Sequence, residues 1–478
     1  MQLSPRNLRA SGRACVLAAT AVALLAGPVA AVAGASSNAV MNLYASPTGS
    51  GGACSQALPC SISTAATTAA SGSTINLADG TYTTGSQLTF TQSNLTIKGA
   101  AASHEPAVVL RPSSPLTNNE VRANPGMTPM EAIIGVSPGS TNVKILNLTI
   151  DGSQAAFDCG QEWAGVMYHN ATGLVQHVHI QNTIPSAGIT GCQAGDAIYV
   201  GTDGPSSTVS IVSDLIDTYN KNGITCNEVG TTCTVRATTV HGTATTAIAQ
   251  NGIQFGFGGG GSITGSTVDH NTYTGTGCPG AGCAAGILLY DSADGVTVTT
   301  SKANSNDNNI YAINDGNVVG QETKSVSITK SKATNSTFFD GITLDSVDLA
   351  NVKKNALTGN TEFGLGIYGA TNATVGASTF ANTVNANTQA GIYIAGPGSA
   401  SSQAHDNVIS FNIVKSNAGP GIFADTGSFH NTIASNAMRY NSPDAKDTTT
   451  GGAGSPPPFD NTWSGNSCIT SSPTSGLC

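Results

Sequence analysis

The chain has 478 residues, of which 57 are Gly and only 9% are charged, and its formal net charge is −9. Sparse charge argues against a disordered or nucleic-acid-binding protein, because both classes are rich in charged residues. Abundant Gly, together with many Ser, Thr and Asn residues, is typical of short strands joined by tight turns.

Residues 1–33 have the pattern of a secretory signal. Three arginines, the last of them Arg13, precede an apolar run from Val16 to Ala33. Removal of this segment leaves 15 basic residues against 27 acidic residues, and such a balance gives no attraction to nucleic acid. No later run of about 20 apolar residues follows. The sequence therefore predicts a secreted, extracellular protein without a membrane anchor.

Ten cysteines follow the signal, and their even number in an exported protein indicates disulfides. No Cys-x-x-Cys motif is present, so the spacing does not favour a metal site. Short loops close easily, and we therefore expect each cysteine to pair with its neighbour along the chain. The expected pairs are Cys54 with Cys60, Cys159 with Cys192, Cys226 with Cys233, Cys278 with Cys283 and Cys468 with Cys478.

The first elements after the signal are short. Ile62–Ala70 is rich in Ala and free of Gly and Pro, which predicts a helix that ends at Gly72. Residues 73–82 alternate like a strand and turn at Asp79-Gly80. Two further short strands are expected at Leu88–Phe90 and Leu95–Ile97.

A repeated phrase then dominates the chain: an apolar run that begins after Gly, Ala or Asn. It recurs at Gly165, Ala197, Gly223, Gly252, Gly286, Asn309, Gly341, Gly366, Gly391 and Gly421. The copies at Gly286, Asn309 and Gly341 are 23 and 32 residues apart, and a period of that size predicts a solenoid of stacked coils. Asn residues at the turns, such as Asn306 and Asn417, are expected to stack on those of the next coil.

The segment Tyr44-Ala45-Ser46-Pro47-Thr48-Gly49-Ser50, the short helix and Leu95-Thr96-Ile97-Lys98-Gly99 follow one another in an order that resembles the start of right-handed parallel β-helix proteins of the pectate-lyase type. Residues 143–152 are similar to the recurring coil strand of that family. The resemblance implies an all-β solenoid over residues 34–441 with a short N-terminal helical cap. We interpret residues 442–478 as a linker and a disulfide-bonded C-terminal cap. The fold hosts many activities, and the catalytic motifs of polygalacturonases, pectate lyases and alginate epimerases are missing here.

Carboxylates close three successive runs and are the candidate catalytic residues: Asp291, Asp315 and Asp345. Adjacent coils stack about 4.8 Å apart, close to the ~5–5.5 Å that separates the two carboxylates of retaining glycosidases. In the sequence alignment of the runs, Asp345 falls opposite Tyr290 rather than Asp291. The same three acids could hold Ca²⁺, or they could simply be exposed turn residues.

A second group of side chains is rich in aromatic residues, which stack on sugar rings. The candidate substrate-binding residues are Trp163, Tyr168, His169, Tyr199, Glu228, Gln254 and Tyr290. If all these runs belong to one sheet, they form a groove that leads to the carboxylates. The structural alternative is that Trp163 packs its own loop on the solenoid and that His169 is an ordinary surface histidine.

These observations predict a secreted carbohydrate-active enzyme that hydrolyses glycosidic bonds of an extracellular polysaccharide with two carboxylates. One alternative is a Ca²⁺-assisted polysaccharide lyase with Lys221 or His169 as the base. The other is a non-catalytic glycan-binding or surface structural protein. We expect a monomer that needs no cofactor unless it is calcium-dependent.

Overall fold

The computed structural model describes residues 40–100, 106–113, 116, 130–153, 162–185, 194–244, 246–274, 284–316, 322–449, 461–472 and 476–478. The signal predicted over residues 1–33 lies outside this part of the chain. The described residues belong to one unit that begins at Val40 and ends at Cys478. No helix among the described residues is long and apolar enough to cross a membrane.

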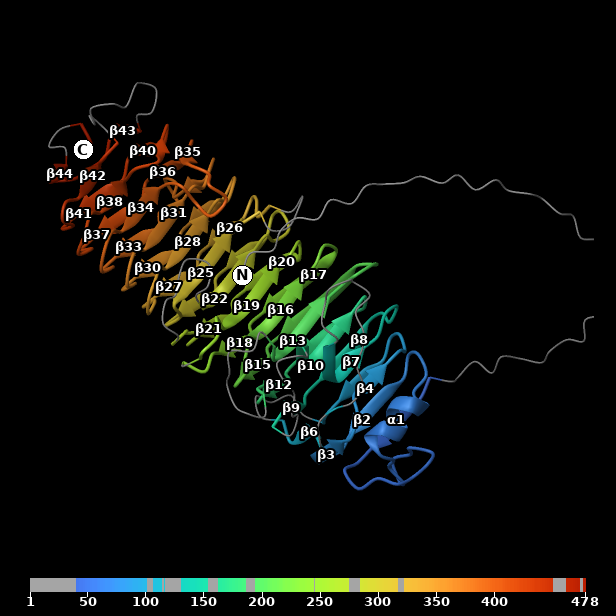
Figure 1. Cartoon of the computed structure of the whole chain (residues 1–478). Coiled ribbons are helices and arrows are strands. Elements are labelled where there is room, and N and C mark those ends of the chain that lie inside the picture. The colour runs from blue at the N-terminus through green and yellow to red at the C-terminus, as the bar shows by residue number, and fades with distance from the viewer. Residues whose placement is uncertain are drawn as a thin grey trace, which may run out of the picture. The chain divides into compact units, whose positions relative to one another are not determined.

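Three long parallel sheets, which we call A, B and C, build the unit that begins at Val40 (Figure 1). From residue 74 to residue 447 the chain visits the sheets in turn, so successive strands lie in different sheets and each strand pairs with strands one coil away. This is the connectivity of a parallel β-helix, as the repeat predicts.

Sheet A consists, in hydrogen-bonded order, of β1 (Asn42–Ala45), β2 (Thr74–Leu77), β5 (Thr96–Lys98), β8 (Val143–Leu146), β11 (Thr172–Gln176), β14 (Ser207–Val212), β17 (Thr231–Arg236), β20 (Gly260–Thr264), β23 (Thr297–Thr299), β26 (Ser327–Thr329), β29 (Asn351–Lys353), β32 (Thr374–Val375), β36 (Val408–Ser410), β40 (Thr432–Ala434) and β43 (Thr462–Ser464).

Sheet B consists of β3 (Gly80–Thr84), β6 (Val108–Pro112), β9 (Thr149–Asp151), β12 (His179–Gln181), β15 (Leu215–Asp217), β18 (Thr239–His241), β21 (Thr267–Asp269), β24 (Lys302–Asn304), β27 (Lys332–Thr334), β30 (Ala356–Thr358), β33 (Thr383–Asn385), β37 (Ile413–Lys415) and β41 (Ala437–Arg439).

Sheet C consists of β4 (Leu88–Phe90), β7 (Met130–Val136), β10 (Glu162–His169), β13 (Asp196–Gly201), β16 (Asn222–Asn227), β19 (Asn251–Gly256), β22 (Ala285–Tyr290), β25 (Asn308–Ile313), β28 (Ile342–Asp345), β31 (Leu365–Tyr368), β34 (Ile392–Ala395), β38 (Ile422–Ala424), β42 (Ala445–Asp447) and β44 (Ser471–Ser472). A small extra pair joins β35 (Ala404–His405) to β39 (Ser428–Phe429).

The expected N-terminal helix is present as α1 (Ile62–Thr68). Ser61 caps it, because the hydroxyl of Ser61 accepts a hydrogen bond from the backbone N–H of Thr64, 3.1 Å away. Ile62, Ala65 and Ala66 are its buried residues.

The core is made of inward-facing apolar residues that repeat at the same position in each coil. In sheet A, Ile145, Val175, Ile211, Val235 and Ile263 pair in sequence from coil to coil, and all five are fully buried. A single coil cannot bury these side chains, so stacking is what stabilises each one.

Asparagine ladders run along the inside of the turns, as the sequence predicts. The amide of Asn360 donates to Asn387, that of Asn387 to Asn417 and that of Asn417 to Asn441, over 2.8–2.9 Å. Asn306 belongs to a similar arrangement, since it accepts a hydrogen bond from the amide of Asn271, 2.9 Å away. These bonds satisfy polar groups that are buried where the chain turns.

Three of the expected disulfides are formed, and they join Cys54 to Cys60, Cys226 to Cys233 and Cys468 to Cys478. The expectation that neighbouring cysteines pair is therefore confirmed at these six positions.

The other two expected disulfides are not confirmed. Cys192 lies outside the described residues, and so does Cys159, so the expected bond between Cys159 and Cys192 stays a prediction. Cys278 and Cys283 also lie outside the described residues, and their pairing stays a prediction as well.

The strand pattern continues past Asn441, where the sequence analysis expects a linker. Ala445–Asp447 forms β42 and pairs with β38, and the carboxylate of Asp444 accepts the backbone N–H of Asn441 at 3.0 Å. A three-residue Ala-Lys-Asp strand has too little apolar character to be recognised by sequence periodicity. Strands β43 and β44 then pair with β40 and β42, while the capping role of this region stays a prediction.

Candidate functional site

The outer face of sheet C carries rows of equivalent side chains, because parallel pairing places the same position of successive coils side by side. One row consists of Tyr199, Thr225, Gln254, Leu288, Tyr311 and Thr343. A second row lies directly before the repeated Gly or its equivalent and consists of Asp196, Asn222, Asn251, Ala285, Asn308 and Asp340. The runs predicted to share one sheet therefore do so.

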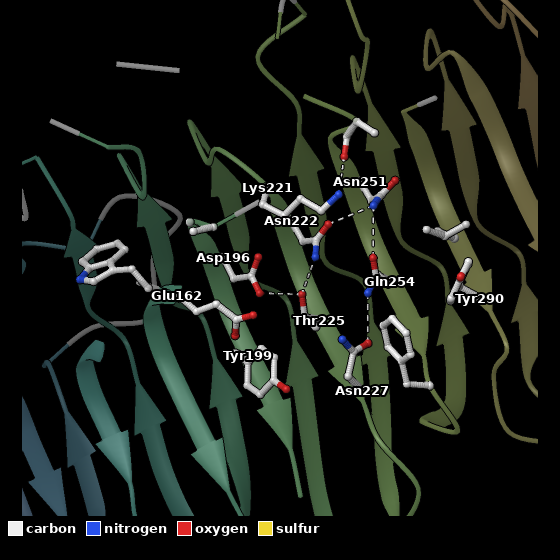
Figure 2. Close-up of a pocket in the computed structure, with 16 residues that line it drawn as sticks. Glu162, Asp196, Tyr199, Lys221, Asn222, Thr225, Asn227, Asn251, Gln254 and Tyr290 are labelled. Carbon is white, nitrogen blue, oxygen red and sulfur yellow. Dashed lines mark hydrogen bonds between the residues drawn. The ribbon is translucent and has the colours of Figure 1, made fainter. Parts of the chain in front are cut away.

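A hollow of about 350 Å³, the first cleft, opens over β10, β13, β16, β19 and β22 (Figure 2). Its lining includes Glu162, Trp163, Asp196, Tyr199, Lys221, Asn222, Thr225, Asn227, Asn251, Gln254 and Tyr290. Five of the residues singled out from the sequence are in this set: Trp163, Tyr199, Lys221, Gln254 and Tyr290.

Hydrogen bonds connect the polar floor of the first cleft from coil to coil. Thr225 donates to Asp196 and accepts from Asn222, each over 2.9 Å. The amide of Asn251 donates to Asn222 over 3.1 Å and to Gln254 over 3.2 Å. Figure 2 shows this chain of contacts running across the strands. The network holds the side chains in fixed orientations, as a binding surface requires.

Lys221 is the basic residue in the lining of the first cleft. Burial lowers the pKa of its amine to about 8, although the charge of Asp196 opposes this shift. The amine donates a hydrogen bond to the carbonyl of Ala249 over 2.7 Å. A substantial fraction of neutral amine is therefore present at mildly alkaline pH, and such an amine can accept a proton.

Three residues of the expected groove have other positions. Tyr168 is completely buried, and its hydroxyl donates to the carbonyl of Val143 over 2.9 Å, so it belongs to the core and cannot meet a substrate. His169 is buried, so it is not the surface histidine of the structural alternative, and it lies 3.2 Å from a carboxylate oxygen of Asp203, away from the cleft lining. Glu228 accepts a hydrogen bond from the hydroxyl of Tyr199 over 2.7 Å. Glu228 therefore orients a residue of the cleft lining without lining the cleft itself.

The three carboxylates proposed from the sequence do not form one row. Tyr290 pairs with Ile313 and Ile313 with Asp345, which confirms the register in which Asp345 falls opposite Tyr290. Asp291 is fully buried and accepts the backbone N–H of Asp315 over 3.0 Å, while Asp315 accepts the hydroxyl of Tyr290. Neither Asp291 nor Asp315 lines the first cleft or the cleft that Asp345 lines.

Asp345 lines a second hollow of about 300 Å³, the second cleft, over β25, β28 and β31. The lining consists of Asn308, Tyr311, Phe339, Asp340, Thr343, Asp345, Glu362 and Tyr368. Three carboxyl groups and three aromatic rings thus share one small space.

Asp340 has the most unusual environment in the second cleft. Burial raises the pKa of its carboxyl to about 8; the hydrogen bond from Thr343 opposes this shift, and the charge of Glu362 adds to it. Thr343 donates to Asp340 over 2.8 Å, and the backbone N–H of Phe363 donates to its other oxygen over 3.1 Å. The carboxyl of Asp340 therefore carries its proton at neutral pH.

Glu362 and Asp345 are the other two acids of the second cleft. Burial raises the pKa of Glu362, opposed by a hydrogen bond from Gln389, but Glu362 is only half-buried and ionises before Asp340. Asp345 accepts hydrogen bonds from the backbone N–H and the hydroxyl of Ser399 over 2.6 and 2.5 Å, and from Tyr311 over 3.3 Å. These donors fix Asp345 as part of the wall.

An apolar cluster separates the two clefts. It consists of Ala285, Leu288, Tyr290, Tyr311 and Ile313. Tyr290 lines the first cleft and Tyr311 lines the second, so the cluster forms a ridge between them on the same face. The expected groove is thus two hollows in line rather than one channel.

Within the described ranges, no group of three or more His, Cys, Asp and Glu side chains is arranged to hold a metal ion. Calcium binding by Asp291, Asp315 and Asp345 stays a prediction.

The sequence analysis missed Asp340 and Glu362 because it followed the ends of the apolar runs. The residue before the repeated Gly was the more informative position, since it faces outward in coil after coil. Asp196, Asn222, Asn251, Asn308 and Asp340 occupy it, and a polar residue there in five coils is the signal that could have revealed the row.

Comparisons with known proteins agree with this architecture. The family model described as periplasmic copper-binding protein (NosD) matches residues 284–476. The N-terminal fragment of bacteriophage Phi29 gene product 12 is similar in structure, with a TM-score of 0.52, 13% identity and coverage of 79% of this chain and 64% of that one. The chain is a right-handed parallel β-helix.

Two other solved structures are less similar. The periplasmic alginate epimerase AlgG gives a TM-score of 0.47 at 11% identity, over 83% of this chain and 77% of that one. The A-module of mannuronan C-5 epimerase AlgE4 from Azotobacter vinelandii gives 0.46 at 11% identity, over 76% of this chain and 86% of that one. No curated protein sequence matches the chain.

Proposed function

We propose that the protein is a secreted carbohydrate-active enzyme that hydrolyses glycosidic bonds in the second cleft, with Asp340 as the general acid and Glu362 as the base or nucleophile. The observation that carries the proposal is that two neighbouring carboxyl groups have environments that separate their ionisation. Asp340 is buried with its pKa raised to about 8, whereas Glu362 is half-exposed and ionises first. Such a separation is how glycosidases assign acid and base roles to two carboxyl groups.

The reaction follows from these protonation states. Asp340 gives its proton to the glycosidic oxygen as the bond to the anomeric carbon breaks, so the leaving sugar departs as an alcohol. Glu362 either attacks that carbon directly, and a water that gives its proton to Asp340 then hydrolyses the glycosyl ester, or Glu362 takes a proton from the attacking water. Asp340 and Glu362 come from adjacent coils and line the same cleft, with Asp340 level with Phe363 rather than with Glu362.

Asp345 has a supporting role in this proposal. It accepts a hydrogen bond from Tyr311, and the aromatic rings of Tyr311, Phe339 and Tyr368 give a sugar ring apolar surfaces. A closely hydrogen-bonded carboxylate is a poor nucleophile but a good positioning group. The three disulfides support the proposed extracellular location.

The test is a screen of the secreted mature chain against neutral and acidic polysaccharides, with reducing ends as the readout. Asp340→Asn and Glu362→Gln should each abolish most of the product, whereas Asp406→Asn, which removes an acid paired with His405 elsewhere on the surface, should not. Full activity in both cleft variants would exclude the proposed pair.

A polysaccharide lyase is the second candidate, and Lys221 is the observation that favours it. Its lowered pKa allows the amine to remove a proton next to a sugar carboxylate in the first cleft. Lyase products contain a carbon–carbon double bond and absorb ultraviolet light. The lyase candidate expects this absorbance to appear and to be lost in Lys221→Gln, whereas the hydrolase proposal expects none.

A further inference from the structure

Aromatic rings continue along sheet C beyond the second cleft. Phe363 and Tyr393 are stacked, with ring centroids 4.4 Å apart and planes inclined by 17°. Tyr393 pairs with Phe423 across β34 and β38, and their centroids are 5.4 Å apart. Figure 1 shows β31, β34 and β38 side by side in the orange and red part of the solenoid. Three rings from three successive coils thus follow one another along one face.

These rings line a hollow of about 380 Å³ that we call the aromatic platform, formed by Phe363, Gln389, Tyr393, Gly419 and Phe423 together with their neighbours. The platform adjoins the second cleft. Glu362 lines that cleft while Phe363 lines the platform, and Tyr368 of the cleft lies 5.8 Å from Tyr393 between ring centroids. A chain-like ligand in the cleft would therefore meet the platform next.

Acidic groups outnumber basic groups around the platform. The hydroxyl of Tyr393 donates to the carboxylate of Asp425 over 3.0 Å, and the amine of Lys446 lies 4.1 Å from the centroid of the Phe423 ring. Burial raises the pKa of Tyr393, and the charges of Asp425 and Glu362 both add to this shift. Two acids and one base at the edge give no attraction to a polyanion.

Structural packing alone explains only part of this arrangement. Phe363 is 9% exposed and belongs to the packing of its turn. Tyr393 and Phe423 are only partly buried although the strands that carry them are paired on both sides within a regular sheet. Outward positions of a β-helix need no aromatic residue for folding, because the core lies on the other side.

We propose that Phe363, Tyr393 and Phe423 form a stacking platform for the sugar rings of a neutral polysaccharide, which extends from the second cleft along the coils of β31, β34 and β38. The inference rests on the proposed function in that the same glycan chain occupies the second cleft. Sugar rings present flat apolar faces rimmed by hydroxyl groups, and rings with nearby amide, hydroxyl and carbonyl groups match both features.

Binding of the full mature chain to cellulose, xylan, galactan and polygalacturonate tests the platform. Affinity gel electrophoresis measures it, with thermal unfolding as the check of folding. Tyr393→Leu and Phe423→Leu, which keep bulk but remove the flat ring, should each weaken binding to a neutral polymer at least tenfold. Tyr393→Phe keeps the ring and should retain binding, as should Phe411→Leu, which alters a ring 43% exposed at the end of β36 in sheet A.

The result that overturns the inference is equally definite. Failure of the wild type to bind any of the three neutral polymers, binding to polygalacturonate alone, or unchanged binding by both platform variants each excludes a neutral-glycan platform. Binding only to a second copy of the chain, or only to another protein, would also exclude a neutral-glycan platform.

The two proposals can fail separately. Asp340→Asn should bind the polymer but not cleave it, and the platform variants should cleave a short chromogenic glycoside normally while losing activity on the polymer through a higher KM. Cleavage retained by Asp340→Asn would exclude the acid–base pair and leave the platform as the face of a binding protein.

Discussion

The backbone N–H of Phe363 donates a hydrogen bond to the carboxyl of Asp340, 3.1 Å from nitrogen to Oδ1, and so joins two adjacent coils at the second cleft. Asp340 is therefore held in place by the coil that also carries Glu362. Its raised pKa and the earlier ionisation of Glu362 have a direct consequence for the pH dependence of the proposed reaction.

Hydrolysis should have a bell-shaped pH profile. Activity rises as Glu362 loses its proton, above the ordinary value of 4.5, and falls as the pH passes about 8, where Asp340 loses the proton that it must donate. Asp340→Asn should lower kcat by about 10²–10⁴-fold, the usual contribution of a general acid. The kcat measured from pH 4 to pH 10 checks both statements, and an alkaline limb that survives in Asp340→Asn would assign it to another group.

The asparagine ladder should contribute measurably to stability. Asn387→Ala removes the acceptor of the Asn360 amide and the donor to Asn417, and leaves buried polar groups without partners. A cost of about 1–3 kcal/mol is expected for such a loss. Urea unfolding measures it, and Gln56→Ala at an exposed position is the control. Equal stability of Asn387→Ala and the wild type would mean that the ladder is dispensable.

A pH-dependent contribution should come from His241 and Asp269 on sheet B, which are 2.6 Å apart. The hydrogen bond to Asp269 raises the pKa of His241 against the effect of burial. Burial would raise the pKa of Asp269, but hydrogen bonds from His241 and His270 outweigh it and lower the pKa.

The signs of these two shifts define a window. The histidine contribution is complete below its unfolded pKa of about 6.5, and the aspartate contribution is complete above about 3.9. Stabilisation by the pair is thus greatest between these values, fades as the pH rises through the folded pKa of His241, and fades as it falls through that of Asp269. Because His241 is nearly half exposed, the effect should be about 0.2–1 kcal/mol. His241→Gln should therefore lower Tm more at pH 5.5 than at pH 8.5, and an equal loss at both values would contradict the ion pair.

Removal of divalent metal separates the hydrolase from the calcium-assisted lyase. The acid–base pair in the second cleft uses no metal, so dialysis against EDTA should leave hydrolysis unchanged. The lyase alternative expects activity to disappear and to return with CaCl₂. Reducing-end and ultraviolet assays on the same samples measure the two outcomes.

The sequence predicts the architecture well because each coil of the solenoid follows from a local sequence pattern that is repeated along the chain. The strand at Leu95–Ile97 survives almost unchanged as β5, and the alignment of Asp345 with Tyr290 is confirmed. Pairing of neighbouring cysteines is also confirmed wherever the structure describes both partners. It is not confirmed for Cys192, which lies outside the described residues together with its expected partner.

The site is harder to predict, because its properties depend on the turn of the coil. Asp291 follows Tyr290 by one residue, yet its left-handed backbone, with φ of 42°, places it in a buried turn while Tyr290 stays on the cleft wall. Asp340 precedes the apolar run rather than ending it, and its raised pKa comes first from burial, with a smaller contribution from the charge of Glu362 one coil later. The hydrophobic periodicity of the sequence does not reveal either property of Asp340.

The asparagine ladders also mean that the solenoid can change in length by whole coils. Asn360, Asn387, Asn417 and Asn441 occupy equivalent positions, and each of the first three donates to the next member and to a backbone carbonyl of the preceding coil. Excision of residues 361–387 would therefore present Asn360 with Asn417 as an equivalent partner. A solenoid of this kind can be lengthened or shortened by whole coils without a new set of contacts. The number of coils would then set how many sugar units the proposed platform can hold, independently of the chemistry in the second cleft.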